Sequence, residues 1–98
     1  MEGMTLKNFK QTMIEFDEIE FTYHGIMYNF QKENLTDNKI KISIWQGGDN
    51  PKCLYSVDVE DNVIKIIEVV EKLINTKIFF DGKSIIDGES DITVEFFT

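Results

Sequence analysis

The 98-residue chain contains no arginine and no alanine, and it has a single cysteine, histidine, tryptophan and proline. Without arginine it cannot form the bidentate guanidinium clamps that hold carboxylates and phosphates, for which lysine is no substitute. The lone Cys53 excludes an internal disulfide and cannot by itself build a metal cluster. A single thiol is typical of a reducing compartment, so we expect a cytoplasmic protein. The excess of isoleucine, asparagine, lysine and phenylalanine favours AT-rich codons and suggests a bacterial or phage genome.

Long hydrophobic runs and a basic N-terminal region are also missing, so we expect neither a membrane span nor a signal peptide. The net charge is −8, and residues 54–98 carry ten acids against four lysines. Nucleic acids and anionic membranes are bound by neutralising their charge with basic residues, so neither is an expected partner. Three roles are open for the acidic half: it keeps the protein soluble, it forms a docking surface for a basic partner, or it mimics DNA.

Apolar material is ample, because 42% of the residues are hydrophobic and eight are phenylalanine. This amount predicts a folded chain and argues against disorder despite the 29% of charged residues. A chain of this length forms one core. We therefore expect a single domain that spans residues 1–98.

The stretch "IEFTYHGIMYNF" (residues 19–30) alternates apolar and polar residues on both sides of His24-Gly25. This pattern predicts a β-hairpin whose two-residue turn needs positive φ, which glycine accepts freely and histidine tolerates. A slip of one residue would scatter the apolar side chains over both faces, so the register is strongly specified. The predicted pairs are Tyr23 with Ile26, Phe21 with Tyr28, and Ile19 with Phe30.

A second antiparallel hairpin is predicted from two further alternating runs, "KIKISIW" (39–45) and "CLYSVDV" (53–59), joined by the breakers of "QGGDNP". In the second run, Cys53 alternates with Tyr55, Val57 and Val59, which predicts that the thiol faces the core. A final strand at 92–97 is expected at a sheet edge. After residue 75 we expect one or two short strands in total, including this one. The rest of that region consists of "KIFF" and an apolar pair at 85–86, separated by turns.

Two helices complete the prediction. Apolar residues recur at helical spacing near the N-terminus, so we expect a helix at about 5–15 that Thr5 caps. A longer amphipathic helix is expected at about 61–75, capped by Asp61. The fold class is therefore α+β: a mostly antiparallel sheet of four to six strands with both helices packed on one face. The apolar stripe of the predicted helix at about 5–15 consists of Leu6, Phe9, Met13 and Phe16.

No catalytic or metal-binding set emerges from the motifs. His24 could act as an acid or base, but the sequence brings no nucleophile to it, so we interpret it as a turn residue that faces no evident catalytic partner. A deep pocket around His24 would favour a ligand binder or enzyme that uses nearby acids, whereas a solvent-exposed turn would remove that alternative. The acids after Asp81 do not fit the EF-hand spacing. We expect no cofactor, no metal and no catalytic residue.

A candidate interaction surface comes from the strand at 39–45. Trp45 lies on its more polar face together with Lys39 and Lys41, and exposed tryptophans often dominate binding interfaces. The alternative is that a helix or loop buries Trp45.

The hairpin at 18–30 and the segment "LINTKIFFDGKSIIDG" (73–88) resemble short proteins of unassigned function from low-GC Gram-positive bacteria and their mobile elements. The shared motifs are a Tyr-x-Gly hairpin and a Lys-Ile-x-x-Asp-Gly-Lys-Ser segment after a helix, over about half of the chain. The resemblance implies no catalytic residue.

We expect a non-enzymatic module that works by contact with a protein partner or with itself, as a regulator, an inhibitor or a homodimer. The first alternative is an acidic phage-type DNA mimic that blocks a DNA-binding enzyme; the second is the ligand binder or enzyme that uses His24.

Overall fold

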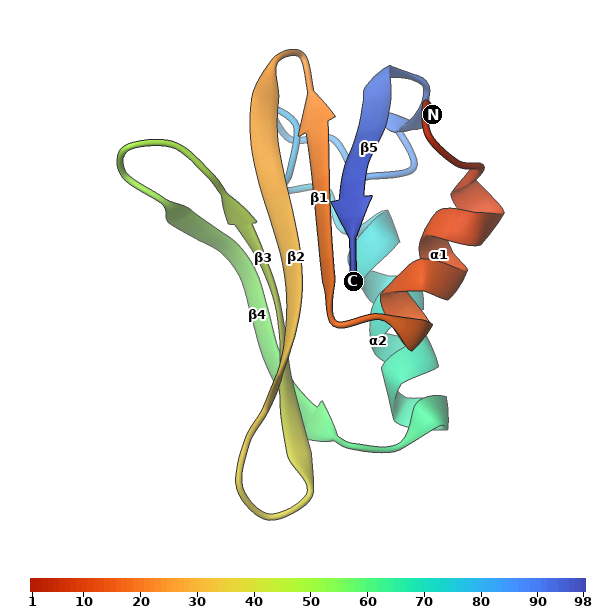
Figure 1. Cartoon of the computed structure of the whole chain (residues 1–98), viewed down its shortest axis with the longest axis vertical. Coiled ribbons are helices and arrows are strands. Elements are labelled where there is room, and N and C mark those ends of the chain that lie inside the picture. The colour runs from red at the N-terminus through yellow and green to blue at the C-terminus, as the bar shows by residue number, and fades with distance from the viewer.

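The computed structural model describes residues 1–98 and consists of one five-stranded antiparallel sheet with two helices on one face (Figure 1). The strand order across the sheet is β4-β3-β2-β1-β5. The predicted α+β class, strand number and helix placement are confirmed. In chain order the elements are α1 (Leu6–Glu15), β1 (Glu18–Tyr23), β2 (Ile26–Asn34), β3 (Lys39–Gln46), β4 (Lys52–Glu60), α2 (Val63–Asn75), a 3-10 helix (Glu89–Asp91) and β5 (Ile92–Phe97).

The first hairpin has the predicted register, with Tyr23 opposite Ile26, Phe21 opposite Tyr28 and Ile19 opposite Phe30. His24 and Gly25 form the turn with φ of 49° and 78°, as the sequence requires. Five of the six aligned apolar side chains are buried, whereas Ile26 beside the turn is 41% exposed. The hairpin therefore sets the core face of the sheet.

The second hairpin is also confirmed, but it contains a β-bulge that the alternation does not show. Ile44 lies opposite Tyr55 and Trp45 opposite Cys53, so Leu54 has no partner on β3. An extra residue on one strand shifts the side chains beyond it to the other face. The prediction that Cys53 faces the core is therefore wrong, and its side chain is exposed.

Both helices begin with a side-chain cap. Thr5 caps α1 as predicted, since its hydroxyl accepts the backbone N–H of Asn8 at 3.2 Å. The cap of α2 is Asn62, whose side-chain oxygen accepts the N–H groups of Ile64 and Lys65 at 2.9 and 3.3 Å. The prediction of Asp61 is wrong by one residue, because the N–H of Asp61 still extends the β3–β4 ladder to the carbonyl of Asn38 at 2.9 Å.

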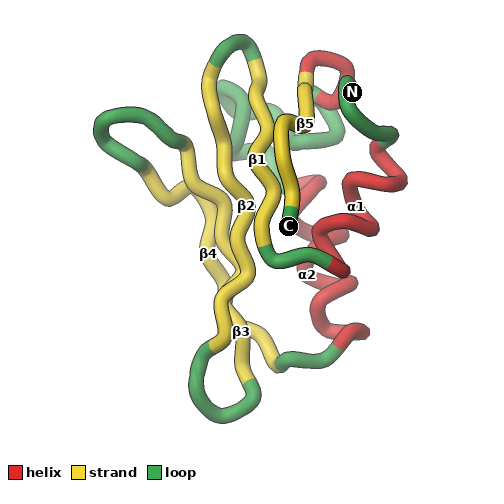
Figure 2. Tube along the Cα trace, in the orientation of Figure 1, coloured by secondary structure: helices red, strands yellow, loops and turns green.

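The segment between α2 and β5 is built of turns and one short 3-10 helix, so only one strand forms after residue 75 (Figure 2). Its apolar side chains nevertheless complete the core: Phe79, Phe80 and Ile85 are buried. Phe80 stacks on Tyr23 with ring centroids 3.9 Å apart. Gly88 packs against these rings so closely that a Cβ atom would lie 2.6 Å from Phe80 Cδ2.

Ser84 and Asp87 close the turn in this segment by exchanging hydrogen bonds. The N–H of Ser84 donates to Asp87 Oδ2 at 3.1 Å, and the N–H of Asp87 donates to Ser84 Oγ at 3.0 Å. The bonds from Ser84, backbone first, and the nearby Lys77 and Lys83 hold the pKa of the Asp87 carboxyl below its ordinary value. Asp87 thus stabilises the turn as a carboxylate.

We predict that Asp87→Asn lowers the free energy of unfolding at about pH 7 and that this difference is smaller at about pH 2.5. The folded pKa lies below the unfolded one, so the carboxylate stabilises the fold above the unfolded pKa, and this contribution is lost as the pH falls through the folded pKa. Urea denaturation at the two pH values measures it. Asp49→Asn in the exposed 47–51 loop controls for the lost charge. An equal loss of stability at both pH values would contradict the prediction.

Candidate functional site

The face of the sheet opposite α1 and α2 has no covering layer, and Trp45 lies on it. The Trp45 side chain is partly exposed, and its indole N–H donates to Ser43 Oγ at 3.3 Å. Ser43, which accepts this bond, is only 1% exposed although it lies on this open face. Neither helix buries Trp45, so its ring is accessible from the open face.

The two lysines of the predicted surface lie among acids. Lys41 is opposite Glu33 on β2 and Asp58 on β4, and Lys39 is opposite Glu60. Opposite charges across neighbouring strands stabilise a sheet modestly. Lys39 and Trp45 are roughly 20 Å apart along β3 at the rise of an extended strand. The three predicted residues therefore share a face but do not gather at one point.

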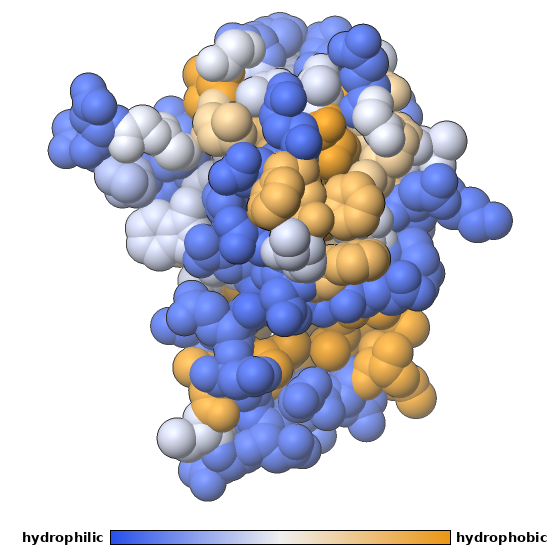
Figure 3. Space-filling model, viewed as in Figure 1, coloured by the Kyte–Doolittle hydropathy of each residue, from blue (hydrophilic) through white to orange (hydrophobic).

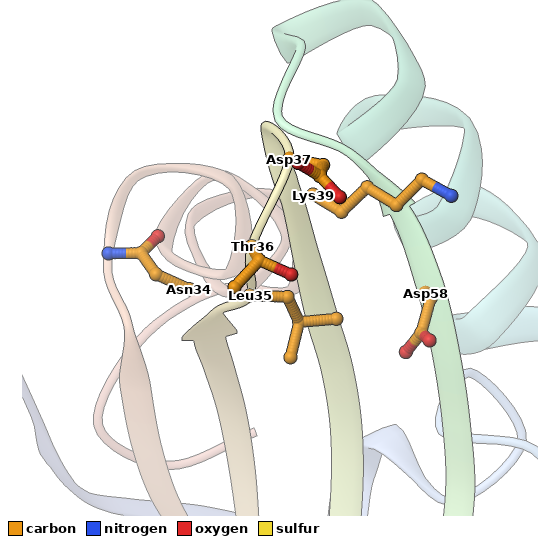
Figure 4. Close-up of a pocket in the computed structure, with 6 residues that line it drawn as sticks. All are labelled: Asn34, Leu35, Thr36, Asp37, Lys39 and Asp58. Atoms are coloured by element: carbon orange, nitrogen blue, oxygen red, sulfur yellow. The ribbon is translucent and has the colours of Figure 1, made fainter.

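Lys39 lines a polar hollow of about 680 Å³ where the β2–β3 loop approaches β4 (Figure 4). Asp37 and Lys39 lie near the tip of the loop, and the Asp58 carboxylate lies across from them on β4. Leu35 is the one apolar side chain in its lining. Small-molecule sites are usually concave and mostly apolar, so this open, charged hollow is a poor ligand pocket.

A second hollow, of about 390 Å³, lies between α1 and the end of β5. Phe16 and Phe97 form its apolar wall, with ring centroids 5.2 Å apart in an edge-to-face arrangement. Their side chains are 36% and 43% exposed. We call this site the phenylalanine groove, and Figure 3 shows apolar side chains gathered at the centre of this face, over β5 and the end of α1. The other lining residues are Gly3, Met4, Asn8, Gln11, Thr12 and Glu15.

Phe16, predicted to share one stripe of the first helix with Leu6, Phe9 and Met13, lies one residue past the end of α1. Phe9 and Met13 of that stripe are fully buried, but α1 ends at Glu15 and Phe16 has an extended backbone. Its N–H still donates to the carbonyl of Thr12 at 2.9 Å. The end of the helix therefore turns the Phe16 ring away from the core and toward β5.

Several bonds fix the wall of the phenylalanine groove. Lys32 Nζ on β2 donates to the carbonyl of Ile14 at 2.7 Å, which ties the last turn of α1 to the sheet. Burial lowers the pKa of Lys32, while Asp17 and Asp61 oppose this effect. The N–H groups of Asp17 and Glu18 both donate to the carbonyl of Thr98, at 2.9 and 3.0 Å. Phe16 and Phe97 are thus held in place from both sides.

The outer edge of β5 borders the phenylalanine groove and is only half covered. The N–H of Glu2 donates to the carbonyl of Ile92 at 2.7 Å, and the N–H of Val94 donates to the carbonyl of Glu2 at 2.8 Å. The chain leaves this edge at Gly3, which packs against Val94. Beyond Val94 no segment pairs with the outer side of β5.

His24 lies at the tip of the first hairpin with 61% of its side chain exposed. Its Nε2 is 2.9 Å from Asp91 Oδ2, an acidic partner that the sequence pattern did not indicate. The imidazole also stacks on Tyr23, with centroids 4.0 Å apart. Neither hollow includes His24, and its side chain bonds no hydroxyl or thiol. A histidine–aspartate pair without a nucleophile or a pocket has no evident catalytic use.

The remaining candidates for chemistry lie apart. Cys53 is exposed, and its thiol donates to the carbonyl of Tyr55 at 3.4 Å. No three histidine, cysteine or acidic side chains come together as ligands for a metal ion. Neither helix has the length and apolar character needed to cross a membrane.

No family model, no curated protein and no solved structure matches the chain.

The structure predicts that His24 is replaceable and Gly25 is not. His24→Asn should change the free energy of unfolding by no more than about 0.5 kcal/mol, because asparagine tolerates positive φ and the bond to Asp91 is exposed. Gly25→Ala should cost about 1 kcal/mol, since the backbone has a φ of 78° and no neighbour lies within 4 Å. Chemical denaturation measures both. A larger loss for His24→Asn would show that its contacts matter more than its backbone.

Proposed function

We propose that the protein is a non-enzymatic binding module that holds an extended segment of a partner protein in the phenylalanine groove. The supporting observation is the pair of partly exposed rings, Phe16 and Phe97, beside an unpaired stretch of the β5 edge. Exposed aromatic patches on small proteins commonly mark interaction sites. A free strand edge adds main-chain hydrogen bonds that an extended peptide can use.

The geometry limits how the partner segment binds. Glu2 already occupies the first half of the β5 edge, so only a few residues of a partner can pair beyond Val94. Most of the affinity must then come from an apolar side chain placed between Phe16 and Phe97. The fixed wall of the groove favours binding, because little side-chain ordering remains to be lost.

Charge indicates the chemistry of the flanking residues. Glu15 is the one charged residue in the lining, and Gln11 orients its carboxylate through a 2.7 Å hydrogen bond. The lining contains no lysine, and Lys10 of α1 is already paired with Glu71 at 2.7 Å. A segment with an apolar anchor flanked by lysine or arginine therefore complements the groove.

The arrangement of charges gives less support to the DNA-mimic alternative. A mimic needs acids in phosphate-like rows, whereas Lys41 stands between Glu33 and Asp58 on the open face. The alternative that uses His24 has no hollow around that residue. Both alternatives lack a feature comparable to the phenylalanine groove.

Selection of random dodecapeptides on the immobilised protein tests the proposal. We predict enrichment of sequences with an aromatic or branched apolar residue between basic residues. Phe97→Ser should weaken the selected peptides by about tenfold or more. Phe96→Ser is a matched control, because Phe96 is the adjacent phenylalanine, is 47% exposed, and points to the opposite face of β5.

Trp45 reports which surface the peptide uses, since it is the only tryptophan and lies on the open face. Acrylamide quenching of its fluorescence should be unchanged by a peptide in the phenylalanine groove. Protection of Trp45, or equal binding to the Phe97→Ser variant, would contradict the proposal and would point to the surface around Trp45, Lys39 and Lys41. Circular dichroism establishes that both serine variants are folded.

A further inference from the structure

The edge of the sheet formed by β4 is the longer free edge of the protein. β4 is the last strand in the order, and it pairs on one side only, with β3. The N–H of Asp61 bonds to Asn38, and opposite residues that bond directly recur at every second position of an antiparallel pair. Tyr55, Val57 and Val59 therefore direct their backbone groups to β3. The backbone groups of Ser56 and Asp58 point outward.

The helix side of β4 is also incompletely covered. Tyr55, Val57 and Val59 face the core but remain partly exposed, unlike the fully buried Ile42 and Ile44 of the neighbouring strand. β4 forms the outer border of the molecule in Figure 1, and its contact with α2 leaves these three side chains partly exposed. A strand placed beside β4 would cover these three side chains and satisfy the outward backbone groups.

We propose that this strand is β4 of a second copy of the chain, paired antiparallel about a two-fold axis at Val57. A two-fold interface places the same strand on both sides, so residue 56 of one copy lies opposite residue 58 of the other. Ser56 and Asp58 then exchange backbone hydrogen bonds across the interface. Their outward backbone groups are the ones that this register needs, and the result is a continuous sheet of ten strands.

The side chains of this register complement each other on both faces. On the helix side, Tyr55 lies opposite Val59 of the second copy, and Val57 lies opposite its own counterpart. Pairs of aromatic and β-branched side chains are favourable neighbours in sheets. On the open side, the Ser56 hydroxyl can donate to the Asp58 carboxylate of the second copy, and the symmetry repeats this bond.

The ends of β4 add charge complementarity. Lys52 is the strand's only basic residue and lies at its start, whereas Glu60 and Asp61 lie at its end. Because Leu54 is the extra residue of the bulge, the register resumes with Lys52 opposite Asp61 of the second copy. An axis at Asp58 would instead place two carboxylates opposite each other. An axis at Ser56 would place Asp58 opposite the bulged Leu54.

Sedimentation equilibrium over a concentration series tests the proposal with Ser56→Pro. Proline removes the outward N–H of Ser56, which has no partner within the chain, and edge strands tolerate it. The variant should stay folded and raise the dimer dissociation constant about thirtyfold, because two symmetric hydrogen bonds are lost. Ser56→Ala keeps the N–H and loses only the hydroxyl bonds, which Ser56→Pro loses as well, so it should weaken the dimer clearly less than Ser56→Pro does.

A charge swap provides a second test that does not depend on proline. Lys52→Glu should weaken the dimer about tenfold, and the double variant Lys52→Glu/Asp61→Lys should return it to within about threefold of the parent. Hydrogen exchange of the parent should show the amides of Ser56 and Asp58 becoming protected as the protein concentration rises.

A protein that stays at 11.4 kDa at millimolar concentration would overturn the proposal. So would a dimer that is unaffected by both Ser56→Pro and Lys52→Glu, because it would use another surface. The phenylalanine groove lies at the opposite edge of the sheet, so peptide binding by a monomer or by a dimer tests the proposed function separately.

Discussion

The register of β1 and β2 about the His24-Gly25 turn determines which face of the sheet becomes the core. Ile19, Phe21 and Phe30 lie on one face only in this register, and a slip of one residue would move a whole strand's apolar set to the other face. The remaining apolar elements must then collect on that face: both helices, and the turn segment that brings Phe80 onto Tyr23. The opposite face is mostly polar, and its exposed aromatic rings are Phe96 and Trp45, whose indole N–H donates to Ser43.

The sheet is covered by helices on one face only, and its two edge strands, β4 and β5, are only partly covered. The two short helices cover β4 only in part on one side and leave the end of β5 open on the other. At β5 the N-terminal residues supply a partial cover through Glu2, and the gap that remains is the phenylalanine groove. At β4 the bulge at Leu54 is the only irregularity. Both proposed contacts therefore lie at sheet edges that the rest of the chain covers only in part.

The sequence predicts those features that depend on local pattern and fails where one residue or a distant neighbour decides. The alternation of 19–30 specifies its register because six apolar residues agree, and Thr5 caps its helix as expected. Cys53 is misplaced because a single extra residue reverses the alternation, and neither glycine nor proline marks the bulge. The apolar run at 78–80 is too short to distinguish a strand from a turn that packs into the core.

The phenylalanine groove could not be predicted in the same way, because it joins residues near both ends of the chain. One signal was present: Phe96 and Phe97 are consecutive in a strand, so their side chains point to opposite faces and cannot both be buried against one helix layer. The strand order that makes β4 an edge is likewise a property of the whole topology.

The charge of the protein constrains how either edge can be used. Two copies that each carry −8 repel each other over distances comparable with the screening length of about 8 Å at physiological ionic strength. Pairing through β4 must overcome this repulsion by contacts at short range, and Lys52 beside the acids at the other end of the strand supplies the local opposite charge. A basic partner segment at the β5 edge is attracted by the same net charge that opposes self-association. The contacts at the two edges therefore differ in their dependence on salt. Added salt should favour the dimer until its ion pairs are screened, whereas it should weaken the binding of the basic segment at every concentration.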